Sequence, residues 1–129
     1  MTPTSLRRLL AAAKTTQRRA HAPYSKFRVG AALLTKSGKI YTGCNVENAS
    51  YGLTICAERV AITKAVSEGH RHFEAIVVVC PSAKPTPCGA CRQFLAEFGD
   101  MTVICADSRN GKRVQIYRLA ELLPHAFEL

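Results

Sequence analysis

Two cysteines in the second half of the chain, Cys88 and Cys91, are separated by two residues, and this pair constrains the fold more than any other feature. A C-x2-C pair can place two thiolates on one metal ion from a single turn of the chain. Cys56 lies 32 residues before Cys88 and can supply a third sulfur, and Glu58 follows it by two positions. The chain must therefore fold so that two segments distant in sequence meet at one point.

Three protein ligands leave one corner of a tetrahedral zinc ion open, as in catalytic zinc sites, whereas structural sites have four. Such a zinc ion acidifies a water molecule, and a carboxylate nearby can carry the proton. Cys-x-Glu followed by Pro-Cys-x-x-Cys is typical of zinc deaminases that act on nucleobases. We therefore predict zinc on Cys56, Cys88 and Cys91, with Glu58 as general acid and base. The alternative is a structural zinc site closed by another cysteine or a histidine.

The other three cysteines, Cys44, Cys80 and Cys105, each end or interrupt an apolar stretch, so we predict buried free thiols. Six cysteines in a short chain can also indicate a disulfide-bonded secreted protein. Against this, Leu9–Ala13 is too short for the apolar core of a signal peptide, and no apolar run approaches the ~20 residues of a membrane span. We expect a reducing, cytoplasmic location and no membrane partner.

The length of 129 residues and the hydrophobic fraction of 47% suit a single globular domain, which we place at residues 1–129. Nine lysines and arginines precede the first acid, Glu47, so the formal net charge of +9 belongs to the first third of the chain. Such a segment can bind nucleic acid or resemble a transit peptide. We interpret it as a solvated surface that keeps the protein soluble.

Apolar periodicity predicts alternating helices and strands. Leucines and alanines at helical spacing predict an amphipathic helix that begins near Thr2 and ends before Pro23, and the polar segment Asn45–Tyr51 is predicted to be a loop. An α/β layer structure follows, with the junctions at Cys56 and Cys88 side by side at one edge of the sheet. The expected strands are Phe27–Thr35, Ile40–Cys44, Phe73–Cys80, Met101–Ala106 and Val114–Tyr117, and the later helices are Cys56–Glu68, Cys88–Phe98 and Leu119–Leu123.

Beyond the zinc motif, the sequence resembles the small, homotetrameric, three-cysteine type of cytidine deaminase. The resemblance implies a three-layer α/β/α fold with a mixed five-stranded sheet and one zinc ion per subunit. It also implies hydrolytic deamination of cytidine and 2′-deoxycytidine in pyrimidine salvage, and a tetramer with sites at subunit contacts. The matching segments are Ala22–Phe27, Gly43–Asn48, Cys56–Arg59, Pro87–Gln93 and Leu122–Phe127, in family order over nearly the whole chain.

The resemblance also implies roles for individual residues. Besides the three ligands and Glu58, it assigns the ribose hydroxyls to one loop, an aromatic packed on the nucleoside to the first strand, and a ring delivered into the neighbouring subunit's site to the C-terminus. The implied substrate contacts are Asn45, Glu47, Asn48 and Tyr51 in the loop, Ala57 beside the first ligand, and the aromatics Phe27 and Phe127.

Three thiolates on a divalent cation leave a net charge of −1, which opposes the acidification of water, so a compensating cation is expected near the sulfurs. The candidates are Arg59, close after Cys56, and Arg92, directly after Cys91. Their alternative role is that of a surface or interface guanidinium.

Other functions stay open from the residues alone. A deaminase that edits tRNA or single-stranded DNA would use the basic first third for phosphate contacts, although the short chain argues against a nucleic-acid partner. A non-catalytic zinc module would keep zinc and fold without turnover. A deaminase of an antibiotic such as blasticidin S would be expected to alter the Asn45-x-Glu47 segment.

Overall fold

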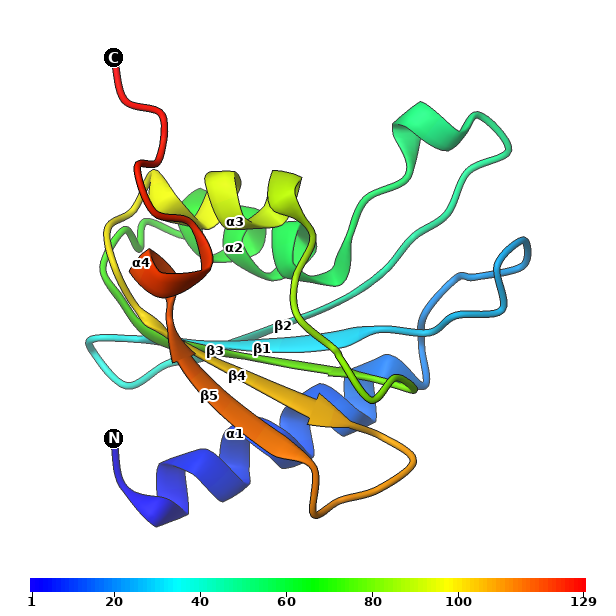
Figure 1. Cartoon of the computed structure of the whole chain (residues 1–129), viewed down its shortest axis with the longest axis horizontal. Helices are drawn as coiled ribbons and strands as arrows, with labels where there is room; N and C mark the ends of the chain where they lie inside the picture. The colour runs from blue at the N-terminus through cyan, green and yellow to red at the C-terminus, as the bar shows by residue number, and fades with distance from the viewer.

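A five-stranded sheet with the strand order β2-β1-β3-β4-β5 forms the middle layer of the protein (Figure 1). The computed structural model describes residues 1–129. The strands are β1 (Gly30–Thr35), β2 (Ile40–Cys44), β3 (Phe73–Cys80), β4 (Thr102–Asp107) and β5 (Val114–Arg118). The helices are α1 (Pro3–Gln17), α2 (Ala57–Ser67), α3 (Gly89–Ala96) and α4 (Leu119–Leu122), with a 3-10 turn, η1, at Tyr51–Leu53.

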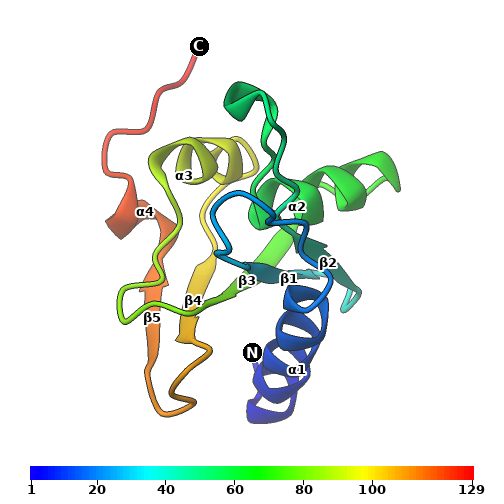
Figure 2. The same cartoon turned by 90° about the vertical axis from the view of Figure 1, so that its right-hand side faces the viewer.

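The sheet is mixed. β1 runs antiparallel to both β2 and β3, β3 and β4 are parallel, and β4 and β5 are antiparallel. Helix α1 covers one face, and α2 and α3 cover the other (Figures 1 and 2). The predicted three-layer α/β/α fold with a mixed five-stranded sheet is therefore confirmed.

Strand β3 is buried on both faces, which explains its nearly continuous apolar sequence. Val77 and Val79 belong to the core cluster under α1, together with Leu9. Ile76, which points to the opposite face, belongs to the cluster under α2 and α3, together with Ile62. Successive residues of the strand thus supply two separate cores.

Helix α2 packs against β2 through small residues. Its alanines Ala57, Ala61 and Ala65 are fully buried. Across from them is Gly43 of β2, where an added Cβ would lie 2.4 Å from the carbonyl oxygen of Ala57. Any larger residue at this position would push the helix away, so Gly43 sets the depth at which α2 begins.

The first helix is shorter than predicted. It ends at Gln17, and the chain then becomes extended because His21 pairs with the segment after β2. The amide of His21 donates to the carbonyl of Asn45, and the amide of Glu47 donates to the carbonyl of His21. This long-range pairing overrides the helical periodicity of the residues before Pro23.

The first strand also begins later than predicted, at Gly30 instead of Phe27. The side chain of Asn45 takes up the backbone groups that a longer strand would pair. Its Oδ1 accepts from the Val29 amide at 2.9 Å, and its Nδ2 donates to the Phe27 carbonyl at 2.8 Å. The predicted loop after β2 contains η1 and projects away from the sheet (Figure 1).

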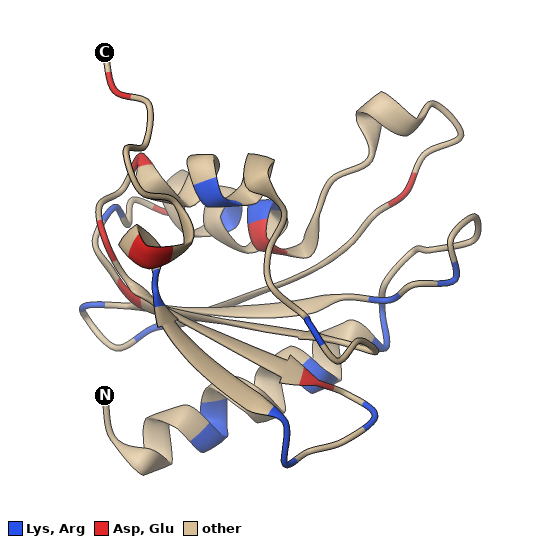
Figure 3. Cartoon of the chain, viewed as in Figure 1, with Lys and Arg blue, Asp and Glu red and all other residues tan.

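The basic residues of the first third lie on the surface, as predicted for a solvated face. Lysines and arginines are spread along α1 and over loops at both ends of the sheet (Figure 3). The exposed ones in or just after α1 are Arg7, Arg8, Lys14, Arg18 and Arg19. None of the helices combines the length and the apolar character needed to cross a membrane.

Candidate active site

Helices α2 and α3 each follow a loop, and the N-cap residue of each is a cysteine. Cys56 precedes α2 and Cys88 precedes α3, each with extended backbone angles, and Cys91 lies in the first turn of α3. The Sγ atoms of these three cysteines all lie within 4.8 Å of one another. Every residue of the chain is described, and none of Cys44, Cys80, Cys105 or the histidines belongs to this group of possible metal ligands.

The sulfurs lie at helix N-termini, where the helix dipole stabilises a thiolate. A hydrogen bond from Cys91 and another from the Arg59 guanidinium lower the pKa of Cys56 to about 5, against the effect of burial. The same bond raises the pKa of Cys91, which acts as its donor. Three soft sulfur donors in this spacing fit zinc, and this cluster is positioned to bind it.

Glu58 is the one carboxylate buried beside the sulfurs. It lies in the first turn of α2 with only 4% of its surface exposed. Burial raises the pKa of Glu58 to about 7, and the neighbouring Cys56 thiolate contributes to the increase. A carboxyl group that titrates near neutral pH can both accept and donate a proton.

A pocket of about 250 Å³ opens onto this cluster. Of the predicted site residues, Cys56, Cys88, Glu58, Ala57, Asn45 and Phe27 line it. The lining also includes residues that the sequence analysis did not assign to the site: Val29, Thr54, Val78, Cys80, Ser82, Lys84, Pro85 and Thr86. Val78 and Cys80 could have been found from the alternation along β3, and the segment 82–86 from its position directly before Cys88.

Asn45 and Glu47 lie in two neighbouring hollows. Asn45 lines the pocket that opens onto the sulfurs, but its side chain forms hydrogen bonds with the backbone of Phe27 and Val29. Glu47 lies in the adjacent hollow, which shares Thr54 with the pocket. Its carboxylate accepts from the amides of Tyr24 and Ser25, at 3.0 and 3.1 Å, and from the Ser25 hydroxyl. These bonds, the Ser25 hydroxyl's foremost, lower the pKa of Glu47.

Besides Glu47, three of the predicted substrate contacts lie outside the pocket that opens onto the sulfurs. Asn48 forms bonds within its own loop, accepting from the Ser50 amide at 2.9 Å. Tyr51 is 77% exposed and packs edge-on against Tyr24 at a centroid distance of 6.3 Å. Phe127 is 70% exposed at the C-terminus. Within one chain, therefore, only part of the predicted substrate set comes together.

The two candidate arginines differ. Arg59 donates from Nη2 to the Cys56 sulfur at 3.7 Å and to the Thr54 carbonyl at 3.1 Å, while its buried Nε has no partner. Arg92 donates to the carbonyls of Pro87 and Leu122, both at 2.8 Å, and forms no hydrogen bond with a sulfur. Only Arg59 directly contacts a ligand sulfur.

Comparison with known proteins agrees with this geometry. Residues 3–107 match the family model described as the cytidine and deoxycytidylate deaminase zinc-binding region, so the chain belongs to this family. A probable cytidine deaminase of Dictyostelium discoideum is 60% identical over 107 residues, covering 81% of this chain and 73% of the relative. A cytidine deaminase of Sporosarcina psychrophila is 49% identical, covering 93% of this chain and 89% of its own length.

A solved structure shows the same fold. The crystal structure of cytidine deaminase from Burkholderia pseudomallei superposes with a TM-score of 0.90 at 46% sequence identity, covering 98% of this chain and all of the other. The matched family region includes all three cysteines and Glu58. Zinc is therefore the cofactor that fits the cluster.

Proposed function

We propose that this protein hydrolyses cytidine and 2′-deoxycytidine to uridine and 2′-deoxyuridine, with release of ammonia, in pyrimidine salvage. The observation that carries the proposal is the group of three sulfurs beside one buried carboxyl group, facing a pocket of about 250 Å³. The names of the close relatives support a nucleoside as substrate. A pocket of this volume, lined by both apolar and polar side chains, suits a small molecule.

Zinc, held by Cys56, Cys88 and Cys91, would supply the Lewis acidity that activates a water molecule. Glu58 accepts the proton that this water loses and donates it to N3 of the pyrimidine, which makes C4 electrophilic. After the hydroxyl has added to C4, Glu58 takes the remaining proton of that hydroxyl and passes it to the amino group. The C4–N bond then breaks, the oxygen stays on C4 as a carbonyl, and ammonia leaves. A pKa raised toward 7 by burial suits a group that must act in both directions.

We assign the substrate contacts on both sides of Thr54. Phe27 and Ala57 line the pocket and would contact the base. The ribose hydroxyls would lie where the two hollows meet, between Asn45 and Glu47, because each hollow includes Thr54. Asn48 and Tyr51 belong to the same loop and are assigned to the edge of this sugar site.

We further propose that residues 1–129 act as one deaminase domain in a cytoplasmic homotetramer whose sites lie at subunit contacts, with one zinc ion per subunit. The large exposed apolar side chains support the assembly, since a second copy would remove them from water. Three of them, Tyr51, Leu53 and Ile55, lie on the projecting loop, and Phe127 lies on the C-terminal segment. Arg59 is assigned to compensate the charge of the thiolates.

The test is to follow the loss of cytidine absorbance with zinc-loaded protein, after chelation, and after zinc is restored. We expect turnover of cytidine and 2′-deoxycytidine that disappears with the metal and returns with it. Turnover confined to cytosine within an oligonucleotide would favour an editing deaminase, and turnover of blasticidin S alone would favour an antibiotic deaminase. A folded, zinc-loaded protein that releases no ammonia would contradict the proposal.

A further inference from the structure

The C-terminal segment, residues 124–129, is held to the rest of the protein by a single side chain. Beyond Leu123 the chain forms only two hydrogen bonds, and both are with Gln93 of α3. Nε2 of Gln93 donates to the Phe127 carbonyl at 3.1 Å, and its Oε1 accepts from the Phe127 amide at 3.3 Å. One primary amide thus pairs both backbone groups of one residue, as a neighbouring strand would.

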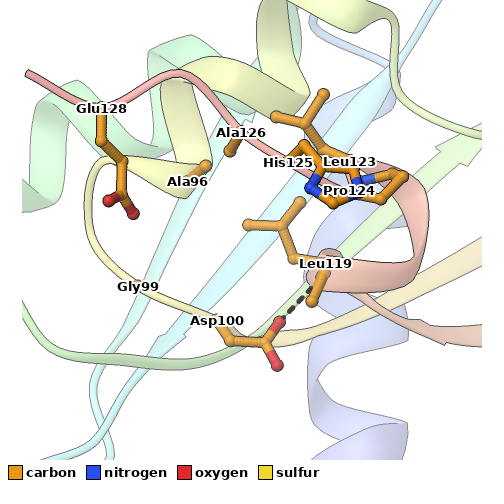
Figure 4. Close-up of a pocket in the computed structure, with 10 residues that line it drawn as sticks. Ala96, Gly99, Asp100, Leu119, Leu123, Pro124, His125, Ala126 and Glu128 are labelled. Carbon is orange, nitrogen blue, oxygen red and sulfur yellow. Dashed lines mark hydrogen bonds between the residues drawn. The ribbon is translucent and has the colours of Figure 1, made fainter.

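Packing contributes little to the position of this segment. A pocket of about 490 Å³ lies behind it, bordered by Asp100 and Leu119 on one side and by Leu123 to Ala126 on the other (Figure 4). The pocket contains none of the zinc ligands. Every side chain of the segment except Ala126 is exposed. The two bonds from Gln93 are therefore the main restraint on where Phe127 lies.

Gln93 follows Cys91 by two residues, and its neighbour Arg92 extends the connection. Arg92 bonds the Pro87 carbonyl, directly before Cys88, and the Leu122 carbonyl at the end of α4. Two consecutive side chains of α3 therefore tie the zinc-binding turn to the end of α4 and to the C-terminal segment.

We propose that Gln93 is a positioning residue that, together with Arg92, fixes Phe127 relative to the zinc-binding turn and thereby sets the affinity for nucleoside. This inference rests on the proposed function together with the role that the family resemblance implies for Phe127, whose ring would contact the nucleoside at a neighbouring subunit's site. The chemistry requires glutamine, because a carboxylate could accept from the Phe127 amide but could not donate to its carbonyl.

The experiment compares Gln93→Ala and Gln93→Glu in the zinc-loaded enzyme. We expect Gln93→Ala to raise KM for cytidine roughly tenfold, from the loss of two hydrogen bonds, with kcat changed less than about twofold. Gln93→Glu, which keeps the acceptor, should fall between wild type and Gln93→Ala. Zinc content should stay at one ion per chain, and hydrogen exchange at the Phe127 amide should accelerate. Gln115→Ala is the matched control, since Gln115 bonds only the Tyr117 hydroxyl.

A double variant separates positioning through Phe127 from a general structural effect. If Gln93 acts through Phe127, adding Gln93→Ala to Phe127→Ala should not raise KM further. An additive double variant, an unchanged KM despite faster exchange, or a loss of zinc with unchanged KM would each overturn the inference. If the wild type fails to deaminate cytidine, the proposed function fails. Hydrogen exchange at the Phe127 amide still tests the contact between Gln93 and Phe127. An unchanged exchange rate in Gln93→Ala would overturn the inference that Gln93 positions Phe127.

Discussion

The two helix starts that carry the sulfurs have the same local design and different surroundings. Cys56 and Cys88 both precede a helix with extended backbone angles and no side-chain cap. At the first start, Glu58 is buried and Arg59 contacts sulfur. At the second, Cys88 is exposed and Arg92 bonds two carbonyls. The first start thus holds the proton chemistry, and the second supplies two ligands and a connection to the C-terminus.

The two helix starts differ in function because the first turn of α2 is buried more deeply than the first turn of α3. Helix α2 is pressed onto β2 through Gly43 and a row of alanines, so its first turn lies inside the protein. Helix α3 begins after a proline-rich loop whose residues line the pocket, and it faces α4 and the C-terminal segment (Figure 2). Two helix starts with the same backbone geometry therefore take on different roles, because burial changes the pKa of a carboxyl group whereas an exposed turn leaves room for contacts with other segments.

The comparison predicts that both helix starts are equally necessary for metal. Cys56→Ser and Cys88→Ser should each lose nearly all zinc and activity, because two remaining thiolates hold the ion too weakly. Metal analysis and the cytidine absorbance assay measure both. Cys44→Ser, outside the cluster, is the control and should keep its zinc. Stoichiometric zinc in Cys88→Ser would show that Cys88 is dispensable for binding.

The second prediction tests whether proton chemistry belongs to the first helix start alone. Glu58→Gln keeps the shape of the side chain and removes its ability to shuttle protons. We expect kcat to fall by about 10²–10⁴-fold while zinc content and nucleoside binding are retained. Gln93→Ala, at the second helix start, should affect KM instead. Near-normal turnover in Glu58→Gln would exclude the assigned role.

The third prediction concerns pH and the buried carboxyl group. In the folded protein Glu58 keeps its proton up to about pH 7, whereas the unfolded chain releases it near 4.5. The folded state therefore binds more protons over this interval, and rising pH weakens it. In chelator-treated protein, the free energy of unfolding of wild type relative to Glu58→Gln should fall by up to about 3 kcal/mol between these pH values. Urea titrations at several pH values measure it, and parallel pH profiles would refute it.

The smallest expected effect separates the two arginines. Arg59→Gln removes a charge and a donor at the Cys56 sulfur, so zinc affinity should fall about tenfold. Arg92→Gln should change zinc affinity by less than about twofold, because its bonds go to carbonyl oxygens. Competition with a chelating dye measures both variants. Equal losses would mean that Arg92 also compensates the thiolates.

Much of the site could be predicted because its signals are local. The C-x2-C pair and the Cys-x-Glu segment each lie within one turn, where spacing fixes which side chains can meet. The choice between Arg59 and Arg92 was not local. Both arginines stand close to a ligand cysteine, and their long side chains reach whatever acceptors the fold brings near: a sulfur for one and the Leu122 carbonyl, 30 residues away, for the other.

The sequence by itself indicated the three candidate metal ligands, the acid beside them and the alternation of helices and strands, since these depend on spacing and periodicity along the chain. Only the tertiary structure decided that Asn45 bonds the backbone before β1, so that the strand begins at Gly30, that Glu58 is buried, and that Gln93 holds the C-terminal segment. Each of these depends on groups distant in sequence that compete for the same hydrogen bonds or the same space. Such competition is settled only when the layers pack.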